Sequence, residues 1–257
     1  MDAIDSANIA LPPPVPDLRR CAILLDIDGS ILDIAPSPRQ VSVPTELRRT
    51  LARLGELTCG AVALVSGRSI DDIDLIFSPL RLAAIGVHGA EMRISGDAKV
   101  QKRTAPLSDA LKRKLAAITE LGPEILIEDK GYSLAFHYRR APEKAAAVLA
   151  AIDRICAEMP GEKVEILPGK MVADIKPAAI SKADAVSALM RHAPFAGRRP
   201  IFIGDDTTDL PVFGMISKVG GHAYSVGEIV ADVDGHFDGP KSVRAWLARI
   251  ATESAAE

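Results

Sequence analysis

The sequence of 257 residues has few of the features that bind nucleic acids or span membranes. One tryptophan, three tyrosines and a net charge of -3 provide neither stacking platforms nor a basic field for nucleic acid or anionic lipid. The longest apolar runs, such as AVALV at 61–65, are far too short to cross a bilayer. We therefore expect no nucleic-acid partner and no membrane partner.

Cysteine is also scarce, and the first residues are not expected to be a signal peptide. Cys21, Cys59 and Cys156 are far apart and odd in number, which favours buried thiols in a reducing, cytoplasmic setting. Residues 1–18 lack the basic start and the long apolar stretch of a signal peptide. The segment PPPVP at 12–16 instead predicts a flexible, extended leader.

Buried-type strands and helices alternate along most of the chain. The pattern predicts strands at 21–27, 59–67, 82–89 and 199–206, and helices at 43–57, 69–77, 181–192 and 242–250. Strands that are apolar on both faces and are joined by helices are typical of a parallel sheet with right-handed crossovers.

Between these segments the pattern changes to a helix followed by a hairpin, twice over. Helices are predicted at 107–121 and 142–158, with hairpins at 124–138 and 163–176 that turn at Lys130-Gly131 and Pro168-Gly169. We therefore predict an α/β fold with a Rossmann-like parallel-sheet core, formed by residues 19–103 and 180–251. An α+β cap domain is inserted at 104–179.

Polar side chains follow three of the predicted core strands. Asp26 and Asp28 follow the first, Ser66-Gly67-Arg68 follows the second, and Asp205 and Asp206 follow a later one, with Asp209 close behind. Ligands of open parallel sheets bind at the carboxyl ends of the strands, so these groups are expected to converge. Two carboxylates about 4 Å apart repel by roughly 4 kcal/mol at an effective dielectric of 20, which calls for a cation. Hard oxygen ligands favour Mg²⁺, and this combination predicts a phosphorylated substrate.

Each motif alone is also typical of an ordinary turn, but the ordered set is more specific. The chain contains four motifs in a fixed order: hhhDxDGS, hhhSGR, a lysine before a helix, and hhhGDDxxD, where h is an apolar residue and x is any residue. This ordered set resembles the haloacid dehalogenase superfamily of phosphotransferases. Over about residues 21–250, the stretches LDIDGSILDIAPSP, VSGRS, GVHGAE, LAFHYR, DIKP and GDDTTDLPVF resemble the trehalose-6-phosphate phosphatase family. The resemblance implies a Mg²⁺-dependent phosphatase that forms an aspartyl phosphate and releases trehalose and phosphate.

The resemblance also implies roles for the core residues. Asp26 is the nucleophile and a metal ligand, and Asp28 is the general acid and base, with its backbone carbonyl as a second ligand. Asp205 is the third ligand, Ser66 contacts a phosphoryl oxygen, and Lys182 neutralises charge. The supporting acids are Asp206 and Asp209, and the substrate-binding positions of the core are Gly29, Gly67, Arg68 and His88.

The inserted cap is expected to recognise the sugar hydroxyls. Glu128, Lys130 and Asp174 match the family's cap positions, although alternating polar residues are also typical of the solvated face of a hairpin. Further candidates are His137, Arg139, Lys170 and Lys176. In GVHGAE, His88 and Glu91 follow a core strand, and His88 either lines the cleft or makes a structural hydrogen bond.

The chain departs from the family pattern at Ser30, Asp174, Ala183 and Leu210, where threonine, glutamate, glycine and an acid are usual. The shorter Asp174 leaves another substrate open, such as sucrose phosphate, a mannosyl phosphate or a hexose phosphate. Two other classes remain: a non-catalytic regulatory module attached to a trehalose-6-phosphate synthase partner, and a phosphate-accepting receiver. The intact Asp26, Asp28, Lys182 and Asp205 argue against the regulatory module, and the long insert argues against the receiver.

Overall fold

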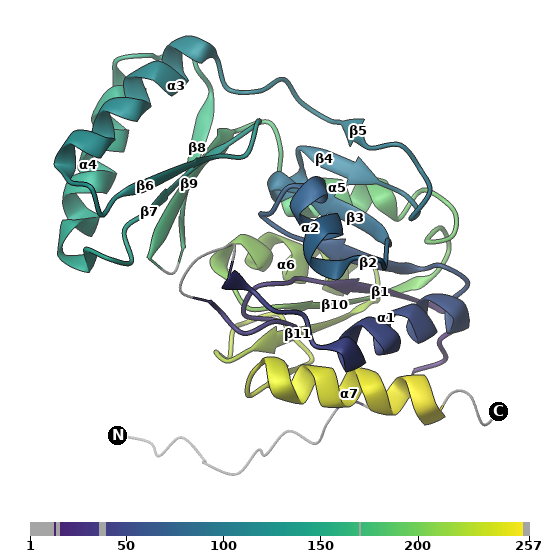
Figure 1. The fold of residues 1–257 in the computed structure, drawn as a ribbon. Coiled ribbons are helices and arrows are strands. Elements are labelled where there is room, and N and C mark those ends of the chain that lie inside the picture. The colour runs from purple at the N-terminus through teal and green to yellow at the C-terminus, as the bar shows by residue number, and fades with distance from the viewer. Residues whose placement is uncertain (1–12, 14–15, 36–39, 170, 254–257) are drawn as a thin grey trace, which may run out of the picture.

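The computed structural model describes residues 13, 16–35, 40–169 and 171–253, and it contains two separate β-sheets (Figure 1). The larger sheet consists of β12 (Gly235–Phe237), β11 (His222–Val226), β10 (Arg199–Gly204), β1 (Cys21–Leu25), β2 (Val62–Val65), β3 (Ala83–Gly86), β4 (Glu91–Arg93) and β5 (Gln101–Lys102), in this order. Strands β12 to β3 are parallel, and β4 and β5 are antiparallel to their neighbours.

Helices cover both faces of this sheet. Helices α1 (Thr45–Leu57), α2 (Ile70–Phe77) and α7 (Pro240–Glu253) pack on one face, and α5 (Lys182–Leu189) and α6 (Leu210–Lys218) pack on the other (Figure 1). Successive residues of β1 pack on opposite faces of the sheet. Ile23 packs on the face covered by α1, α2 and α7, and Leu24 packs on the face covered by α5 and α6; both are fully buried. The predicted α/β core is confirmed, and its parallel sheet carries an antiparallel edge.

Local signals fix the starts of two helices as the sequence predicts. The side chain of Ser69 accepts a hydrogen bond of 3.1 Å from the amide of Asp72 at the start of α2. Ser181 accepts one of 3.0 Å from the amide of Asp184 at the start of α5. Each hydroxyl satisfies one of the amides that a first helical turn leaves without a partner.

The smaller sheet is antiparallel and forms the cap. Its strands are β6 (Leu126–Asp129), β7 (Leu134–His137), β9 (Val172–Pro177) and β8 (Val164–Gly169), in this order. The helical elements of the cap are α3 (Asp109–Ala116), η3 (Ala117–Leu121), η4 (Pro142–Lys144) and α4 (Ala145–Ala157). Helices α3 and α4 pack on the face that points away from the core (Figure 1). The separate cap sheet agrees with the predicted α+β insert, and the limits 104 and 179 stay a prediction.

Side chains of the cap strands alternate between the two faces of their sheet. Ile127, Phe136 and Ile175 pack against the cap helices, whereas Glu128 and Asp174 lie on the opposite face and line a cavity. Successive side chains of a strand point to opposite faces of the sheet. Because the apolar side chains pack against the cap helices, the polar side chains between them point toward the core.

The second hairpin turns later than the sequence predicts. Pro168 and Gly169 belong to β8 and pair with Ala173 and Val172 of β9. The prediction of a turn at Pro168-Gly169 is wrong because β8 is an edge strand, where proline is tolerated. The sequence analysis also did not identify β4, β5, β11, β12 and α6.

Part of the predicted leader lies against the core. The carbonyl oxygen of Pro13 accepts hydrogen bonds from Trp246 Nε1 at 2.9 Å and from Arg249 Nη2 at 2.6 Å, both in α7. Leu18 is buried in the core. Residues 1–12 and 14–15 lie outside the described residues.

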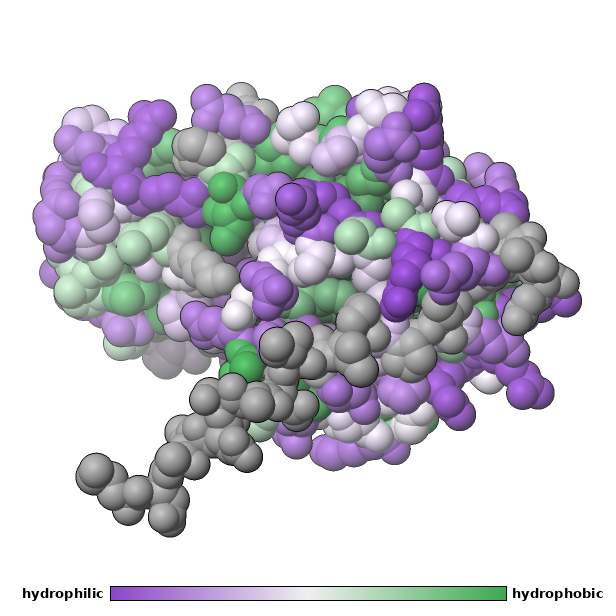
Figure 2. All heavy atoms as spheres, turned by 90° about the horizontal axis from the view of Figure 1, so that it is seen from below, coloured by the Kyte–Doolittle hydropathy of each residue, from purple (hydrophilic) through white to green (hydrophobic). Residues whose placement is uncertain are grey.

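The lower surface of the molecule is largely hydrophilic, with hydrophobic side chains in scattered groups (Figure 2). Among the described residues, no helix has both the length and the apolar character needed to cross a membrane.

Candidate active site

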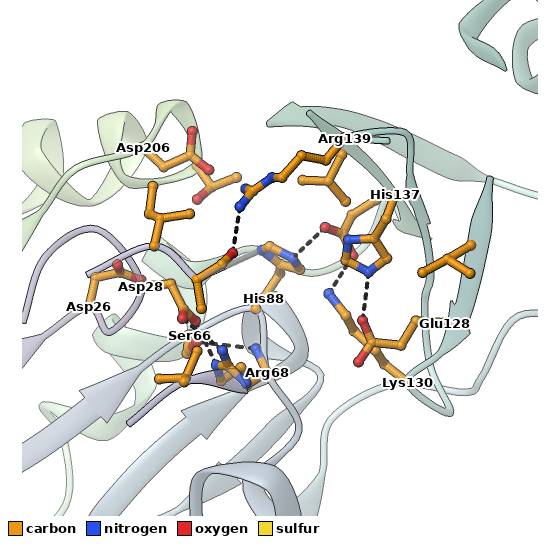
Figure 3. Close-up of a pocket in the computed structure, with 18 of the residues that line it drawn as sticks. Asp26, Asp28, Ser66, Arg68, His88, Glu128, Lys130, His137, Arg139 and Asp206 are labelled. Atoms are coloured by element: carbon orange, nitrogen blue, oxygen red, sulfur yellow. Dashed lines mark hydrogen bonds and ion pairs between the residues drawn. The ribbon is translucent and has the colours of Figure 1, made fainter. Parts of the chain in front are cut away.

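Four parallel strands of the core place polar side chains at their carboxyl ends, on the same side of the sheet (Figure 3). Asp26 follows β1, Ser66 follows β2 and Asp205 follows β10. After β3 the chain forms a short 3₁₀ turn, η2 (Val87–Gly89), which contains His88. The predicted convergence at the carboxyl ends of the strands is thereby realised.

A buried lysine binds two buried carboxylates at the carboxyl ends of these strands. The ammonium of Lys182 donates hydrogen bonds of 2.8 Å to Asp26 Oδ1 and of 2.8 Å to Asp209 Oδ1. Burial raises the pKa of Asp26 to about 7, and it also raises the pKa of Asp209. Burial alone would lower the pKa of Lys182, but the charges of Asp209 and Asp26 raise it above its ordinary value, so Lys182 stays charged.

The same carboxylates fit a cation. One oxygen from each of Asp26, Asp205 and Asp209 lies within 4.8 Å of the other two. Ser30 Oγ donates toward Asp26 Oδ2 at 3.0 Å or Asp205 Oδ1 at 3.2 Å, and so lies between the two carboxylates. Asp209 already accepts three hydrogen bonds, from Lys182 and from the amides of Asp205 and Asp206. This arrangement suits Asp209 to a supporting role, beside a metal site of hard oxygen ligands.

Gly29 permits the close approach of the loop that follows β1 to Asp205. Its φ of +88° lies in the left-handed region, and a Cβ at this position would lie 2.1 Å from Asp205 Oδ2. No side chain fits in that space, so this position requires glycine for two independent reasons.

Arg68 is directed at the predicted general acid. Its Nε and Nη2 donate to the two carboxylate oxygens of Asp28 at 2.6 Å and 2.7 Å. The backbone amide of Arg68 donates to Ser66 Oγ at 3.1 Å, which leaves the hydroxyl hydrogen of Ser66 available for a ligand. Arg68 was predicted to bind substrate, and it lines the cavity while pairing with Asp28.

The cap places two polar pairs opposite these residues (Figure 3). His137 Nε2 lies 2.8 Å from Glu128 Oε2, and this hydrogen bond lowers the pKa of Glu128. Lys130 Nζ donates to Asp174 Oδ1 at 2.7 Å. Burial alone would raise the pKa of Asp174, but Lys130 and His88 hold it well below its usual range. Both carboxylates therefore stay ionised at neutral pH.

A cavity of about 210 Å³ lies between the core and the cap. From the predicted set, its lining contains Asp26, Asp28, Ser66, Gly67, Arg68, His88, Glu128, Lys130, His137, Arg139, Asp174, Lys182 and Asp206. Gly29, Asp205 and Asp209 are not part of this lining and lie next to residues that are. The structure thus brings together core and cap candidates that are far apart in the sequence.

Three weaker candidates have other surroundings. Glu91 accepts a hydrogen bond of 2.9 Å from the amide of Ile70 and so caps α2. Lys176 donates to Glu165 and to the carbonyl oxygen of Ile180, and it does not line the cavity. Lys170 lies outside the described residues.

The cavity also contains residues that the sequence analysis missed. They are Ile34, Ala35, Val41, Glu124, Leu126, Arg140, Val172 and Thr208. The position of Arg140 beside Arg139 was an available signal. The sequence gave no signal for the apolar residues of the cavity, because an apolar side chain on a strand usually indicates a core position.

Comparison with known proteins gives consistent matches. Residues 24–236 match the family model described as trehalose-phosphatase. A probable trehalose-phosphate phosphatase of Sinorhizobium fredii is 39% identical over 91% of this chain and 89% of its own length. The trehalose-6-phosphate phosphatase of Escherichia coli is 36% identical over 90% of this chain and 86% of its own length.

Solved structures show the same fold. The C-terminal domain of Candida albicans trehalose-6-phosphate phosphatase superposes with a TM-score of 0.81 at 21% identity, over 91% of this chain and 93% of that domain. A phosphatase of the haloalkanoate (HAD) superfamily from Bacteroides thetaiotaomicron gives 0.60 at 15% identity, over 97% of this chain and all of its own. These likenesses show that the chain shares the fold of these phosphatases.

The sequence matches identify the family of this chain. The family model spans most of the chain, and two relatives of similar length exceed 30% identity. The chain therefore belongs to the trehalose-phosphatase family.

Proposed function

We propose that the protein hydrolyses trehalose 6-phosphate to trehalose and phosphate, with Mg²⁺ as cofactor, through an aspartyl phosphate on Asp26. One observation carries the proposal. Asp26 lies at the wall of a cavity enclosed by a polar cap sheet, and the ammonium of Lys182 is 2.8 Å from its Oδ1. A carboxylate placed in this way can act as a nucleophile toward a phosphate ester whose sugar occupies the cap side.

In the first step, a carboxylate oxygen of Asp26 attacks phosphorus and the bond from phosphorus to the sugar oxygen breaks. The acid form of Asp28 donates its proton to that departing oxygen, so that trehalose leaves neutral. Ser66 donates its hydroxyl hydrogen to a phosphoryl oxygen, and Lys182 balances the negative charge that accumulates beside Asp26.

In the second step, water attacks the phosphoryl group on Asp26. The carboxylate of Asp28 accepts a proton from this water, the bond from phosphorus to Asp26 breaks, and inorganic phosphate is released. Asp26 and Asp28 return to their starting forms, and no further reactant is required.

Asp26, Asp205 and the backbone carbonyl of Asp28 would hold Mg²⁺, which supplies positive charge that draws the substrate phosphate to the nucleophile. The buried acidic cluster supports this assignment, because three carboxylates with oxygens within 4.8 Å repel one another. Asp206 and Asp209 support the loop through a capping box in which each side chain accepts a backbone amide.

Glu128, Lys130 and Asp174 would recognise the sugar hydroxyls. All three line the cavity from the cap, on the face opposite the cap helices. A buried polar site discriminates strongly against ligands that leave its groups unpaired. The enzyme that forms a phosphorylated disaccharide, a trehalose-6-phosphate synthase, would supply the substrate and is the functional partner that the proposal implies.

The test is phosphate release from trehalose 6-phosphate, sucrose 6-phosphate, glucose 6-phosphate and phosphoglycolate, with and without Mg²⁺. We expect turnover to depend on Mg²⁺ and to favour trehalose 6-phosphate. A preference for another sugar phosphate would keep the role of Asp26 and overturn the role of the three cap residues. If the folded protein releases phosphate from none of the four substrates, the result would favour the regulatory module.

A different sugar phosphate remains the second candidate, because Asp174 is shorter than the glutamate usual at this position and is largely enclosed by the protein. Its Oδ1 accepts a hydrogen bond from Lys130 and its side chain is 10% exposed, so its own reach toward a sugar is short. The same substrate panel decides between the two candidates.

A further inference from the structure

We propose that Lys176 is a positioning residue, a buried lysine of the cap that fixes the segment from which the catalytic Lys182 projects. The inference rests on the proposed function, because it concerns the charge that Lys182 places beside Asp26. It extends that function to a residue that does not line the cavity. Lys176 thereby contributes to the phosphoryl-transfer step without contacting the sugar.

Lys176 is a fully buried cation outside the cavity. It belongs to β9 and is 2% exposed. Its ammonium donates to the carboxylate of Glu165 on the neighbouring strand β8 and to the backbone carbonyl oxygen of Ile180. Burial of an ammonium is unfavourable unless the group is paired and hydrogen-bonded. These two partners therefore fix the ammonium in one place.

The carbonyl group of Ile180 belongs to the short segment that joins β9 to α5. Ile180 is 4% exposed, and its side chain packs with Val87 and Ala90, which follow β3 of the core, and with Tyr132 of the cap. The side chain of Ile180 is thus held by apolar packing, and its carbonyl group is held by the ammonium of Lys176. The peptide group between residues 180 and 181 has little freedom to rotate.

Lys182 follows Ile180 by two residues and begins α5. The residue between them, Ser181, lies against the core, since a Cβ on Gly89 would lie 2.4 Å from the carbonyl oxygen of Ser181. The ammonium of Lys182 lies 2.8 Å from Asp26 Oδ1. A rotation of the peptide group after Ile180 would shift the start of α5, and the ammonium of Lys182 would move with it.

Strand β9 therefore has two different roles in the site. Asp174 and Lys176 are two residues apart, so their side chains lie on the same face of the cap sheet. Asp174 lines the cavity, whereas Lys176 binds the segment before α5. Loss of Lys176 should slow phosphoryl transfer and leave sugar binding largely unchanged.

The experiment measures kcat and KM of the Lys176→Met variant for trehalose 6-phosphate and for p-nitrophenyl phosphate. Methionine is an unbranched side chain that cannot donate to Ile180. We expect kcat to fall about tenfold to a hundredfold, because a small displacement of a catalytic group has this effect on the rate. The factor should agree within about twofold for the two substrates, and KM for trehalose 6-phosphate should change less than about threefold.

Three further variants separate positioning from general destabilisation. Lys114→Met is the matched control and should keep kcat, because Lys114 is a cap lysine that pairs with Glu158 at 3.0 Å and does not line the cavity. Glu165→Gln should keep kcat within about twofold, since the amide oxygen still accepts from Lys176. Lys176→Gln retains polarity but has a shorter side chain, and it should lose kcat even if methionine unfolds the cap. Circular dichroism identifies the folded variants.

A binding measurement tests whether Lys176 acts through Lys182. The probe is inorganic phosphate in the presence of Mg²⁺, with Kd measured by calorimetry. Lys176→Met should raise this Kd about fivefold, because a displaced ammonium attracts the anion less. In the Lys182→Met background, the same substitution should change Kd less than about twofold, since the affected group is already absent.

A normal kcat in folded Lys176→Met or Lys176→Gln would overturn the proposal. A loss confined to trehalose 6-phosphate, or a further rise of Kd in the double variant, would also overturn it. Failure of the proposed function gives a different result. The unsubstituted protein would then hydrolyse p-nitrophenyl phosphate and leave trehalose 6-phosphate intact, while the measurements with p-nitrophenyl phosphate and inorganic phosphate would still test Lys176.

Discussion

The guanidinium of Arg68 holds both carboxylate oxygens of Asp28, with hydrogen bonds of 2.6 Å and 2.7 Å. The two residues follow neighbouring strands, β1 and β2, so sheet pairing brings them together. Because both oxygens are engaged, Asp28 has to turn one of them toward the substrate before it transfers a proton. The position of the proposed general acid is therefore set by Arg68.

Replacement of Arg68 by lysine should reduce kcat by about tenfold to a hundredfold. Lysine keeps the charge, but its ammonium cannot form the two parallel hydrogen bonds that orient a carboxylate. Steady-state kinetics on trehalose 6-phosphate measures the effect. Arg81→Lys is the control, since Arg81 is half exposed and pairs with Asp74 away from the cavity. A normal kcat for the Arg68 variant would exclude the positioning role.

Asp26→Asn should reduce phosphate release by at least about a thousandfold, because an amide cannot form the acyl phosphate. The fold should survive, since the amide fits the same space. Asp33→Asn is a suitable control, because Asp33 is 77% exposed and pairs with Arg244. Circular dichroism should show native spectra for both variants, and substantial residual turnover in Asp26→Asn would rule out this nucleophile.

Gly29→Ala should destroy metal binding as well as activity. The new methyl group would overlap Asp205 Oδ2, whereas Gly131→Ala at a similar φ of +81° meets no atom within 4 Å. Each variant should lose about 1 kcal/mol of stability from the left-handed conformation. Only Gly29→Ala should lose about a hundredfold or more in apparent Mg²⁺ affinity. Equal Mg²⁺ affinities in the two variants would refute the steric argument.

The affinity for Mg²⁺ should depend on pH below about 7. Burial raises the pKa of Asp26 to about 7 in the metal-free protein, and a cation binds the ionised form. Apparent affinity should fall about tenfold per pH unit below 7 and level off above it. The pKa of Asp26 in the folded protein exceeds its ordinary value of 3.8, so the stability of the metal-free protein should rise as pH falls from about 7 to about 4. Calorimetric titrations and thermal melts at several pH values test both trends.

Local patterns in the sequence were sufficient for several parts of the fold. Ser69 and Ser181 were recognisable as helix starts because a capping hydroxyl acts within its own first turn. The convergence of the acidic motifs was predictable because each motif follows a buried parallel strand, and the carboxyl ends of such strands lie at the same end of the sheet. Both kinds of inference require only the neighbouring residues and one rule of topology.

Other features depend on pairing with residues outside their own segment. Strand β4 has only three residues, and it is a strand because β3 pairs with it. The tight pairing of Arg68 with Asp28 follows from neighbouring strand ends, and the approach of His88 to Asp174 requires the cap in its folded position. Composition and periodicity carry no information about such contacts.

The anchoring of Pro13 has a consequence for assembly with other proteins. Its carbonyl oxygen binds Trp246 and Arg249 in α7, the last helix of the described chain. The described chain thus enters and leaves along one helix, at the base of the core and remote from the cap (Figure 1). A partner protein that docks on α7 beside Arg249 would therefore contact the Pro13 segment as well, on the side of the core remote from the cap.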